Sequence, residues 1–417
     1  MFFYIDPGTG SMLFTILIGV IGAAIYAFRN LLVKVKFRIS GGKQTQTDEN
    51  RSPIVVFTDS KRYQTIFKPL CDEMEKRGEP LLYLTASSDD PLLKETYSHV
   101  KTEFIGEGNR AFARMNFLKA DIVLSSTPGL DVYQWKRSRD VKCYAFIVHA
   151  ANDVSEYRMF GLDYFDAILV NGQFQVDQIR KLEKLRHLPE KETVLVGLPQ
   201  LDDLKAKLEM APPKENPTRT ILLAPSWGAS GIFSRFKGRL IEELRKTGYH
   251  LIIRPHPQSL VSEKDLIDSL RAQYPDSENL EWNFDNDNFD ALNRSDLLIS
   301  DFSGVLFDFA LAFDKPVLYA DVSFDKGPYD AWWLDEEMWM FGILPKIGIQ
   351  LTEENIGNIR EVMDRALTAP ELKAGRDLAR QQAWANPGRS VELTADWLVE
   401  TRRRLAEAPA EEQKAAS

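Results

Sequence analysis

Short apolar segments alternate with helix-forming segments along most of the chain, and this alternation constrains the fold more than any other feature. The apolar segments lie at 53–59, 80–85, 102–106, 121–127, 143–150, 166–172 and 193–199, and again at 220–226, 249–256, 279–283, 295–301 and 315–321. Apolar strands separated by helices are typical of parallel sheets that are covered on both faces. We therefore predict an α/β protein with two Rossmann-like domains that face a cleft.

The domain boundaries are predicted from the composition of the connecting segments. Residues 40–53 are polar and contain glycine, serine and proline, which is typical of a linker. We expect the first Rossmann-like domain at 54–210 and, after a proline-rich stretch, the second at 218–390. A helix at 391–405 can return to brace the first domain, and residues 406–417 are expected to form a disordered tail.

The N-terminus combines an uncharged apolar run with a basic segment. Met12–Phe28 carries no charge, whereas residues 29–43 carry five positive charges and no acidic residue. As a helix the run rises about 25 Å, close to the hydrocarbon thickness of a bilayer of about 30 Å. The positive charges follow the run, whereas a signal peptide has them before it, and a core helix seldom ends in such a segment. We therefore expect residues 1–39 to be a single-pass anchor in membrane lipids, with the N-terminus outside and the body in the cytoplasm.

The overall charge and the cysteine content exclude several classes of protein. The formal net charge is −9, so the chain lacks the broad basic surface that nucleic-acid binding needs, and we expect no nucleic-acid partner. The only cysteines are Cys71 and Cys143, which excludes a disulfide framework and a cysteine-based zinc site. The sequence shows no metal-ligand pattern, and we predict no obligatory metal ion.

Two polar side chains at the end of a predicted strand are framed by prolines. The sequence Arg254-Pro255-His256-Pro257 follows the apolar segment HLII, and proline restricts both its own backbone and that of the residue before it. A rigidly held imidazole beside a forked guanidinium suits phosphate binding. The alternative is a strand terminator with incidental charges. We predict that Arg254 and His256 bind a phosphorylated ligand.

The segment Asp301-Phe302-Ser303-Gly304 connects another predicted strand to an apolar helix. Ser303 suits the N-cap position, and Gly304 lets a ligand approach the backbone amides at the positive end of the helix dipole. Capping alone is an equally simple interpretation. Asp308 is the only charged residue inside that apolar helix, and its burial requires a partner such as an arginine or a ligand hydroxyl. We predict an anion site at this helix start.

Two further strand ends carry candidate site residues. Ser226 lies in a glycine-containing loop after the segment TILLAP, where backbone amides can surround a phosphate. His149 ends the strand CYAFIV and can act as a general base near neutral pH, although a hydrogen-bonded core histidine is the simpler interpretation. The role of the tryptophans Trp332, Trp333 and Trp339 stays open, because they fit an acceptor surface, a membrane-facing patch or a local aromatic core.

The second half of the chain resembles the CDP-glycerol glycerophosphotransferase family, whose members build teichoic-acid-type polymers. The resemblance is carried by APSW at 224–227, LIIRPHP at 251–257 and SDLLISDFSGVLFDFALAFDKPVLY at 295–319, and more loosely by His149 and VGLPQLDDL at 196–204. It implies a GT-B-like fold in which the first domain faces the acceptor and the second binds the nucleotide donor. The implied donor is CDP-linked, the acceptor is a membrane-associated polymer or a lipid-linked molecule, and no cofactor is needed.

The resemblance also implies roles for the candidate residues. His149 would remove the proton from the acceptor hydroxyl as this attacks the phosphorus next to glycerol, and CMP would leave. Arg254 and His256 would stabilise the charge that develops on the phosphates. The other donor-binding candidates are Ser226, Asp301, Ser303, Gly304 and Asp308.

Three positions differ from the family pattern. Ala150 follows His149 where the family usually has glycine. Gln200 replaces the usual arginine of the Gly-x-Pro-Arg-x-Asp turn, and Gly304 replaces the second serine of the Asp-Tyr-Ser-Ser turn. Two alternatives therefore stay open. One is a sugar-nucleotide-dependent glycosyltransferase of envelope polysaccharide on the same architecture, and the other is a non-catalytic, membrane-tethered binding protein on the same fold.

Overall fold

The computed structural model describes residues 51–407 except 213–217, 229–230, 286, 302 and 321–323. The predicted membrane anchor at 1–39 and the predicted tail beyond 407 lie outside these residues. Within the described part of the chain, no helix has the length and the apolar character that crossing a bilayer requires. The described residues from Ser52 to Glu407 form one compact unit.

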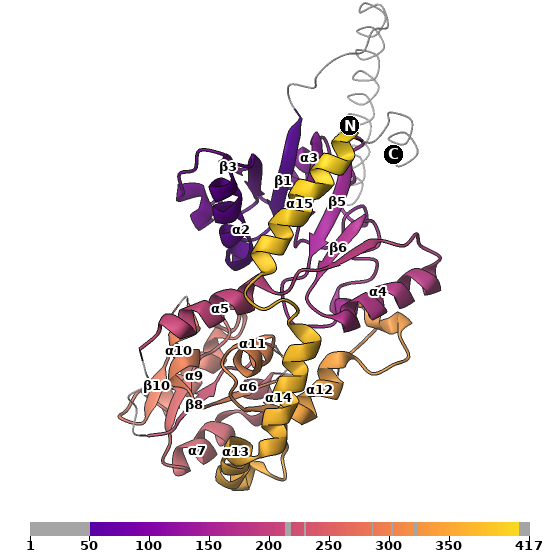
Figure 1. Ribbon diagram of the computed structural model, residues 1–417. Coiled ribbons are helices and arrows are strands. Elements are labelled where there is room, and N and C mark those ends of the chain that lie inside the picture. Colours follow the sequence, from indigo (N-terminus) through magenta and orange to yellow (C-terminus); the bar gives the residue numbers. More distant parts are fainter. Residues whose placement is uncertain are drawn as a thin grey trace, which may run out of the picture. The chain divides into compact units, whose positions relative to one another are not determined.

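The first sheet has seven parallel strands in the order β3-β2-β1-β4-β5-β6-β7 (Figure 1). These strands are β1 (Ser52–Thr58), β2 (Leu81–Thr85), β3 (Val100–Phe104), β4 (Ala120–Ser125), β5 (Val141–Ile147), β6 (Ala167–Val170) and β7 (Glu192–Leu195). The order reverses between β1 and β4, which are hydrogen-bonded neighbours. In open α/β sheets, ligands bind beyond the carboxyl ends of the strands at such a reversal.

The second sheet has six parallel strands in the order β10-β9-β8-β11-β12-β13. These strands are β8 (Thr220–Leu223), β9 (His250–Ile253), β10 (Leu280–Trp282), β11 (Leu297–Ser300), β12 (Val317–Ala320) and β13 (Gly348–Leu351). The order reverses between β8 and β11, so this sheet repeats the pattern of the first. All the predicted strands are present, and the prediction of two Rossmann-like sheets is confirmed. Strand β13, with the sequence GIQL, was not predicted, because Gln350 interrupts its apolar pattern.

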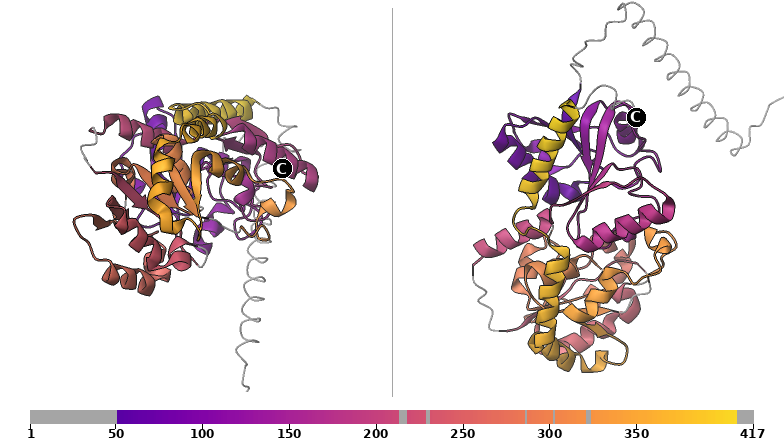
Figure 2. Two further views of the ribbon diagram at one scale, coloured as in Figure 1. Left: turned by 90° about the horizontal axis from the view of Figure 1, so that it is seen from below. Right: turned by 45° about the vertical axis from the view of Figure 1, so that its right-hand side comes forward.

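Helices lie on both faces of each sheet (Figures 1 and 2). The helices are α2 (Gln64–Arg77), α3 (Asn109–Met115), α4 (Gln173–Arg186), α5 (Pro199–Met210), α6 (Ile232–Phe236), α7 (Gly238–Lys246), α8 (Ser259–Ser262), α9 (Lys264–Gln273), α10 (Phe289–Arg294), α11 (Val305–Ala312), α12 (Trp339–Ile347), α13 (Ile359–Thr368), α14 (Pro370–Ala383) and α15 (Ser390–Glu407). Short 3-10 helices are η1 (Lys61–Tyr63), η2 (Pro91–Lys94), η3 (Val154–Glu156), η4 (Asp330–Trp333) and η5 (Ile356–Asn358). We call the part around the first sheet the first lobe and the part around the second sheet the second lobe.

Apolar side chains cover both faces of each sheet. In β1, Ile54 and Val56 belong to one buried cluster, whereas Val55 and Phe57 belong to another on the opposite face. The strands of the second sheet divide their side chains between two clusters in the same way. Because both of their faces are buried, central strands such as β1 and β8 are apolar at nearly every position, which explains the continuous apolar segments of the sequence.

The chain returns from the second lobe to the first through the connection between α14 and α15, and Asp202 on α5 holds this connection. Its carboxylate accepts a hydrogen bond from the indole N–H of Trp384 at 2.9 Å. It also accepts bonds from the backbone amides of Gly388 at 2.7 Å and Ser390 at 3.0 Å. Helix α15 then lies against the first sheet, where Ala395 is part of the buried cluster that contains β1. The C-terminal helix therefore packs against the first lobe.

Polar contacts also join the two lobes near α4 and α12. Asp153 accepts hydrogen bonds from the backbone amides of Trp339 and Met340 at 2.8 and 2.9 Å. Arg186, at the end of α4, forms an ion pair with Asp330 in which both side chains are buried. Loss of one partner from a buried pair is costly, because the other charge is left uncompensated. These contacts hold the two lobes together, which a site shared between the lobes requires.

Candidate functional site

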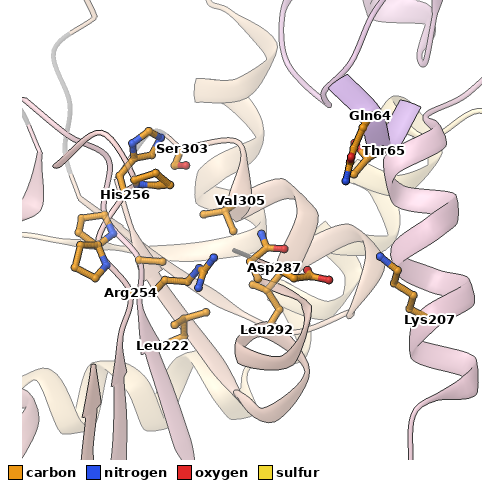
Figure 3. Close-up of a pocket in the computed structure, with 15 residues that line it drawn as sticks. Gln64, Thr65, Lys207, Leu222, Arg254, His256, Asp287, Leu292, Ser303 and Val305 are labelled. Atoms are coloured by element: carbon orange, nitrogen blue, oxygen red, sulfur yellow. The ribbon is translucent and has the colours of Figure 1, made fainter. Parts of the chain in front are cut away.

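A cavity of about 490 Å³ lies at the carboxyl edge of the second sheet (Figure 3). It is placed where the strand order reverses, because Ala224 and Pro225 follow β8 and Ser303 follows β11. The first lobe contributes Gln64 and Thr65, at the start of α2, to the lining. Small-molecule sites usually have volumes of about 300–1,000 Å³. The cavity therefore has the position and the size of a substrate site between the lobes.

The cavity brings together three of the predicted site residues. Arg254 and His256, which follow β9, line it together with Ser303 at the start of α11. The other predicted residues are not among its lining residues: they are Ser226, Asp301, Gly304, Asp308 and His149. The cavity thus brings a guanidinium, an imidazole and a hydroxyl group to one site.

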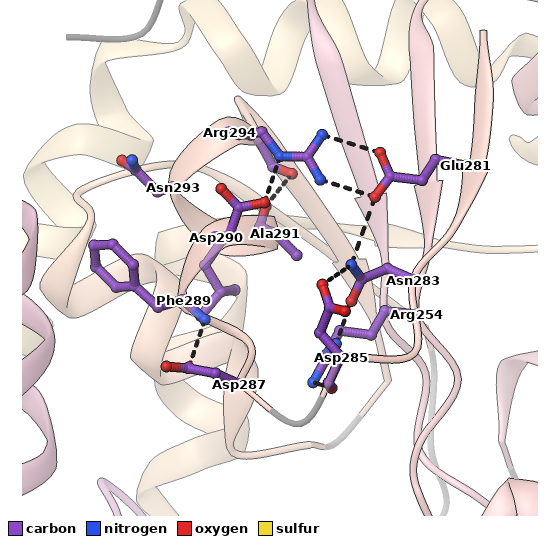
Figure 4. Close-up of polar contacts among 12 residues, drawn as sticks. Arg254, Glu281, Asn283, Asp285, Asp287, Phe289, Asp290, Ala291, Asn293 and Arg294 are labelled. Carbon is purple, nitrogen blue, oxygen red and sulfur yellow. Dashed lines mark hydrogen bonds and ion pairs between the residues drawn. The ribbon is translucent and has the colours of Figure 1, made fainter. Parts of the chain in front are cut away.

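Arg254 presents its charge to the cavity without a carboxylate partner (Figure 4). Its guanidinium donates hydrogen bonds to the side-chain oxygen of Asn283 and, at 2.7 Å, to the backbone oxygen of Asp285. Within the described residues it forms no ion pair. Burial lowers the pKa of Arg254, whereas the nearby carboxylates of Asp285 and Asp287 raise it. Because its hydrogen-bond acceptors are neutral, the positive charge of Arg254 is not compensated by an ion pair in the described part of the chain and can attract an anionic ligand.

His256 is oriented by a backbone hydrogen bond. Its Nδ1 accepts a bond from the amide of Gln258 at 3.1 Å, so in the neutral ring the proton is on Nε2. Burial lowers the pKa of His256, and the negative charges of Asp301 and Glu263 offset part of this effect. The imidazole is therefore neutral at pH 7 and offers a single N–H donor. This fits the predicted role of a hydrogen-bond donor to phosphate.

Asp301 and Ser226 support the cavity rather than line it. The carboxylate of Asp301 accepts hydrogen bonds from the backbone amide of Ser226 at 2.9 and 3.0 Å, and from the amide of Ile232 at 3.2 Å. Asp301 is only 1% exposed. A carboxylate that accepts amide bonds fixes a loop in place. In this structure Asp301 therefore organises the glycine-containing loop, whereas the family resemblance implied a role in donor binding.

The start of α11 differs by one residue from the prediction. The N-cap is Gly304, not Ser303, and no side chain caps the helix. The hydroxyl of Ser303 is therefore not used for capping, and Ser303 lines the cavity. Because α11 begins at this point, its positive dipole end adds to the attraction for an anion.

The buried carboxylate of Asp308 has a hydrogen-bond partner on α5. The partner is the side-chain amide of Gln200, which donates a hydrogen bond to the carboxylate at 2.8 Å. The expected partner was an arginine or a ligand hydroxyl. Burial raises the pKa of Asp308 to about 7, and the bond from Gln200 lowers it only in part. Asp308 therefore joins α11 to α5, the helix that connects the lobes.

His149 lies at the carboxyl end of β5 in the first lobe, where aromatic and hydroxyl groups surround it. The ring of Tyr63 contacts the imidazole edge to face, with 4.9 Å between the ring centres. Nδ1 lies 3.1 Å from the hydroxyl of Ser126 and 3.3 Å from the hydroxyl of Tyr157. Burial, and secondarily the charge of Arg62, lowers the pKa of His149 to about 4. The ring is therefore neutral at pH 7.

The hydrogen bonds of Ser126 determine which nitrogen of His149 carries the proton. The hydroxyl of Ser126 donates its hydrogen to the backbone oxygen of Ile147 at 2.9 Å. It is thus placed to accept from Nδ1, and in the tautomer that makes this bond the proton is on Nδ1 and the lone pair is on Nε2. This is the tautomer that a general base needs.

Several cavity residues were not predicted from the sequence. Asp287 and Asn288 line the cavity and follow β10, whose carboxyl end lies at the same sheet edge as that of β9. The polar run NDN after a strand was the signal that could have identified them. Lys207 lines the cavity from α5, and only the arrangement of the lobes places it there. No group of three or more histidine, cysteine, aspartate or glutamate side chains in the described residues is suited to hold a metal ion.

The tryptophan cluster divides into two environments. Trp339 stacks on Phe174 of α4, with 4.5 Å between ring centres, and lies 5.3 Å from the ring of Phe307. It is therefore part of an aromatic contact between the lobes. Trp332 is 58% exposed and contacts Trp333 edge to face.

Comparison with protein families confirms the resemblance stated from the sequence. Residues 166–336 match the family described as CDP-Glycerol:Poly(glycerophosphate) glycerophosphotransferase. The minor teichoic acid biosynthesis protein GgaB of Bacillus subtilis (strain 168) is 28% identical over 162 residues. That match covers 34% of this chain and 17% of the relative, so the chain corresponds to a small part of that protein.

Solved structures share the fold. The wall teichoic acid polymerase TagF superposes with a TM-score of 0.58 at 15% identity, over 92% of this chain and 99% of that chain. A putative UDP-N-acetylglucosamine 2-epimerase from Listeria monocytogenes superposes with a TM-score of 0.54 at 15% identity, over 86% of this chain and 98% of that chain. These similarities establish a GT-B-like arrangement of two Rossmann-like sheets.

Proposed function

We propose that this chain, which belongs to the CDP-glycerol:poly(glycerophosphate) glycerophosphotransferase family through residues 166–336, transfers a glycerol-phosphate-type group from a CDP-linked donor to a cell-envelope acceptor. The single observation that carries the proposal is the meeting of Arg254, His256 and Ser303 at one cavity. The acceptor is a teichoic-acid-type polymer or a lipid-linked molecule.

The donor pyrophosphate is assigned to the cavity of the second lobe. The forked guanidinium of Arg254 donates to two phosphate oxygens, and Nε2–H of His256 donates to a third. Ser303 and the start of α11 add a hydroxyl donor and the positive dipole end. These donors are fixed before substrate binds, because prolines frame His256 and neutral oxygens hold Arg254. Fixed donors stabilise charge that develops on the leaving phosphate in the transition state.

The acceptor hydroxyl is activated from the first lobe. Nε2 of His149 takes the hydroxyl proton while the oxygen attacks the phosphorus next to glycerol. The new phosphorus–oxygen bond forms as the bond to the CMP oxygen breaks, and CMP leaves with the electron pair. His149 is connected to the donor cavity through Tyr63, which contacts its ring and directly precedes Gln64 of the cavity lining.

A panel of nucleotide donors tests the proposal. CDP-glycerol, CDP-ribitol, UDP-N-acetylglucosamine and a GDP-sugar are added to the full chain, and thermal unfolding and nucleotide release are measured. At 100 times its Kd, a ligand adds about 2.7 kcal/mol to the free energy of unfolding. We expect CDP-linked donors to raise the Tm and to release CMP when acceptor is present.

The same panel separates the alternatives. Stabilisation by the UDP or GDP donor, with release of UDP or GDP, would identify a glycosyltransferase instead. Stabilisation by CDP-glycerol without any release, in the presence of a polymer acceptor, would identify a binding protein on this fold.

We further propose that residues 1–39 anchor the chain in the membrane and hold the two lobes at its cytoplasmic face. The proposal is supported by the uncharged run Met12–Phe28 and the basic segment that follows it. Alkaline carbonate extraction of membranes should retain the full chain and release a variant that begins at residue 51. Release of both would contradict the anchor.

A further inference from the structure

A second cavity lies at the carboxyl edge of the first sheet. Its volume is about 230 Å³, and its lining includes Asp59 and Thr127. Asp59 directly follows β1 and Thr127 follows β4, so this cavity is placed where the strand order of the first sheet reverses. The donor cavity occupies the equivalent position in the second sheet. Each lobe therefore carries a cavity at the place where α/β sheets bind ligands.

Two arginines give the second cavity a positive charge. Arg62 and Arg158 line it, and neither forms an ion pair within the described residues. Arg62 donates a hydrogen bond to the hydroxyl of Tyr63 at 2.6 Å, a neutral acceptor. Asp59 is the only carboxylate in the lining, and its side chain accepts from the hydroxyl of Thr127 at 3.0 Å. Two guanidiniums and one carboxylate suit a ligand that carries both phosphate and hydroxyl groups.

Three residues that contact His149 are sequence neighbours of residues that line the second cavity. The three residues that contact the imidazole are Tyr63, Ser126 and Tyr157. Each is the direct neighbour in sequence of a residue that lines the second cavity, namely Arg62, Thr127 and Arg158. The guanidinium of Arg62 also lies 4.6 Å from the ring centre of Tyr63.

A four-residue segment joins the two cavities. Arg62 lines the second cavity, Tyr63 contacts His149, and Gln64 and Thr65 line the donor cavity. His149 therefore contacts a segment whose residues contribute to the lining of both cavities. This is the position from which a base can take a proton from a molecule in one cavity as it attacks a molecule in the other.

We propose that the second cavity binds the end of the acceptor, with Arg62 and Arg158 on its last phosphate and its terminal hydroxyl directed to His149. The inference rests on the proposed function, because it names the acceptor subsite of the same reaction. A volume below the usual range of about 300–1,000 Å³ limits the ligand to a single polyol-phosphate unit. The rest of the acceptor would extend into solvent.

Direct binding tests the assignment without the transfer reaction. A two-unit glycerol phosphate oligomer, inorganic phosphate and glycerol are titrated into the wild-type full chain and into Arg62→Gln and Arg158→Gln. We expect each variant to bind the oligomer at least tenfold more weakly, and Arg158→Lys to recover part of the loss because it restores the charge without the forked donors. Arg403→Gln is the matched control, since Arg403 is an exposed arginine of α15 with no described ion pair.

Protection from chemical modification provides a second measurement on the wild-type chain, in case a variant does not fold. Phenylglyoxal modifies accessible arginines, and the sites are read by mass spectrometry. The oligomer should protect Arg62 and Arg158 but not Arg403, whereas CDP-glycerol should protect neither of the two cavity arginines. Equal oligomer affinity in wild type and both variants, or no protection, would overturn the assignment. Binding of inorganic phosphate as tight as that of the oligomer would also overturn it, because it indicates a simple anion site.

The outcomes separate this inference from the proposed function. Arginine-dependent binding of the oligomer without CMP release from CDP-glycerol would contradict the transferase and keep the subsite. CMP-releasing transfer whose KM for acceptor is unchanged in Arg158→Gln would keep the transferase and reject the subsite.

Discussion

Replacement of His149 by alanine is expected to reduce kcat for glycerol-phosphate transfer by about 10²- to 10⁴-fold, the usual contribution of a general base. The affinity for the CDP-linked donor should stay near that of the wild type, because His149 is not among the residues that line the donor cavity. The measurement is CMP release at saturating donor and acceptor, with thermal unfolding to confirm the fold. His99→Ala is the control, because His99 is an exposed histidine of the same lobe.

The pH dependence adds an independent test of the same residue. A base is active when it is unprotonated, so the rate should stay constant as pH falls from 8 to about 5 and drop as pH approaches the His149 pKa of about 4. A drop centred near 6.5, the ordinary histidine value, would contradict the buried environment of this ring. Ser126→Ala should lower kcat by a smaller factor and change the pH profile, because it removes the group that places the proton on Nδ1.

Replacement of Arg254 by glutamine is expected to reduce kcat/KM by about 10²- to 10³-fold, the effect of removing one fixed donor to a developing negative charge. Among the described residues, Arg254 is the only arginine that lines the donor cavity, and the substitution removes its guanidinium. Arg254→Lys should recover only part of the activity, since an ammonium group offers the charge without the forked geometry. Donor binding is measured by calorimetry with CDP-glycerol, and transfer by CMP release.

Arg294 provides the matched control for Arg254 (Figure 4). It lies near the same strand edge but forms ion pairs with Glu281 at 2.8 Å and Asp290 at 2.7 Å, and it does not line the cavity. Arg294→Gln should lower the Tm and leave the affinity for CDP-glycerol unchanged. If the affinity for CDP-glycerol fell equally in both variants, the effect at Arg254 would reflect damage to the fold rather than loss of a phosphate contact.

The fold could be predicted from the sequence because burial on both faces makes parallel strands continuously apolar. Strand β13 was missed, since Gln350 interrupts the pattern and the partly buried edge position tolerates it. Candidate site residues near strand ends, such as Arg254 and Ser303, could be located in the sequence once the strands were predicted. Cavity residues that come from outside the second lobe could not be predicted, because the sequence does not show that α5 brings Lys207 to the cavity.

The sequence alone does not show what Asp301 contacts, because a short motif does not specify the direction of a side chain. A carboxylate at a strand end has the same sequence signature whether it faces a ligand or the backbone amides of a loop, and Asp301 does the latter. Ser303 and Gly304 are both plausible N-caps, and only the backbone path shows that Gly304 takes this position. The partner of Asp308 was unexpected because Gln200 comes from a distant part of the chain.

The bonds of Asp202 also constrain how substrates enter and products leave. Asp202 fastens the returning connection to α5, so the outgoing and returning segments share one pivot. A rotation about this pivot that opens the lobes must break the bonds from Trp339 and Met340 to Asp153. If the lobes open in this way, we expect weaker bonds at Asp153 to shorten the time that product stays bound. Asp153→Asn is thus a substitution outside both cavities that would make product escape faster.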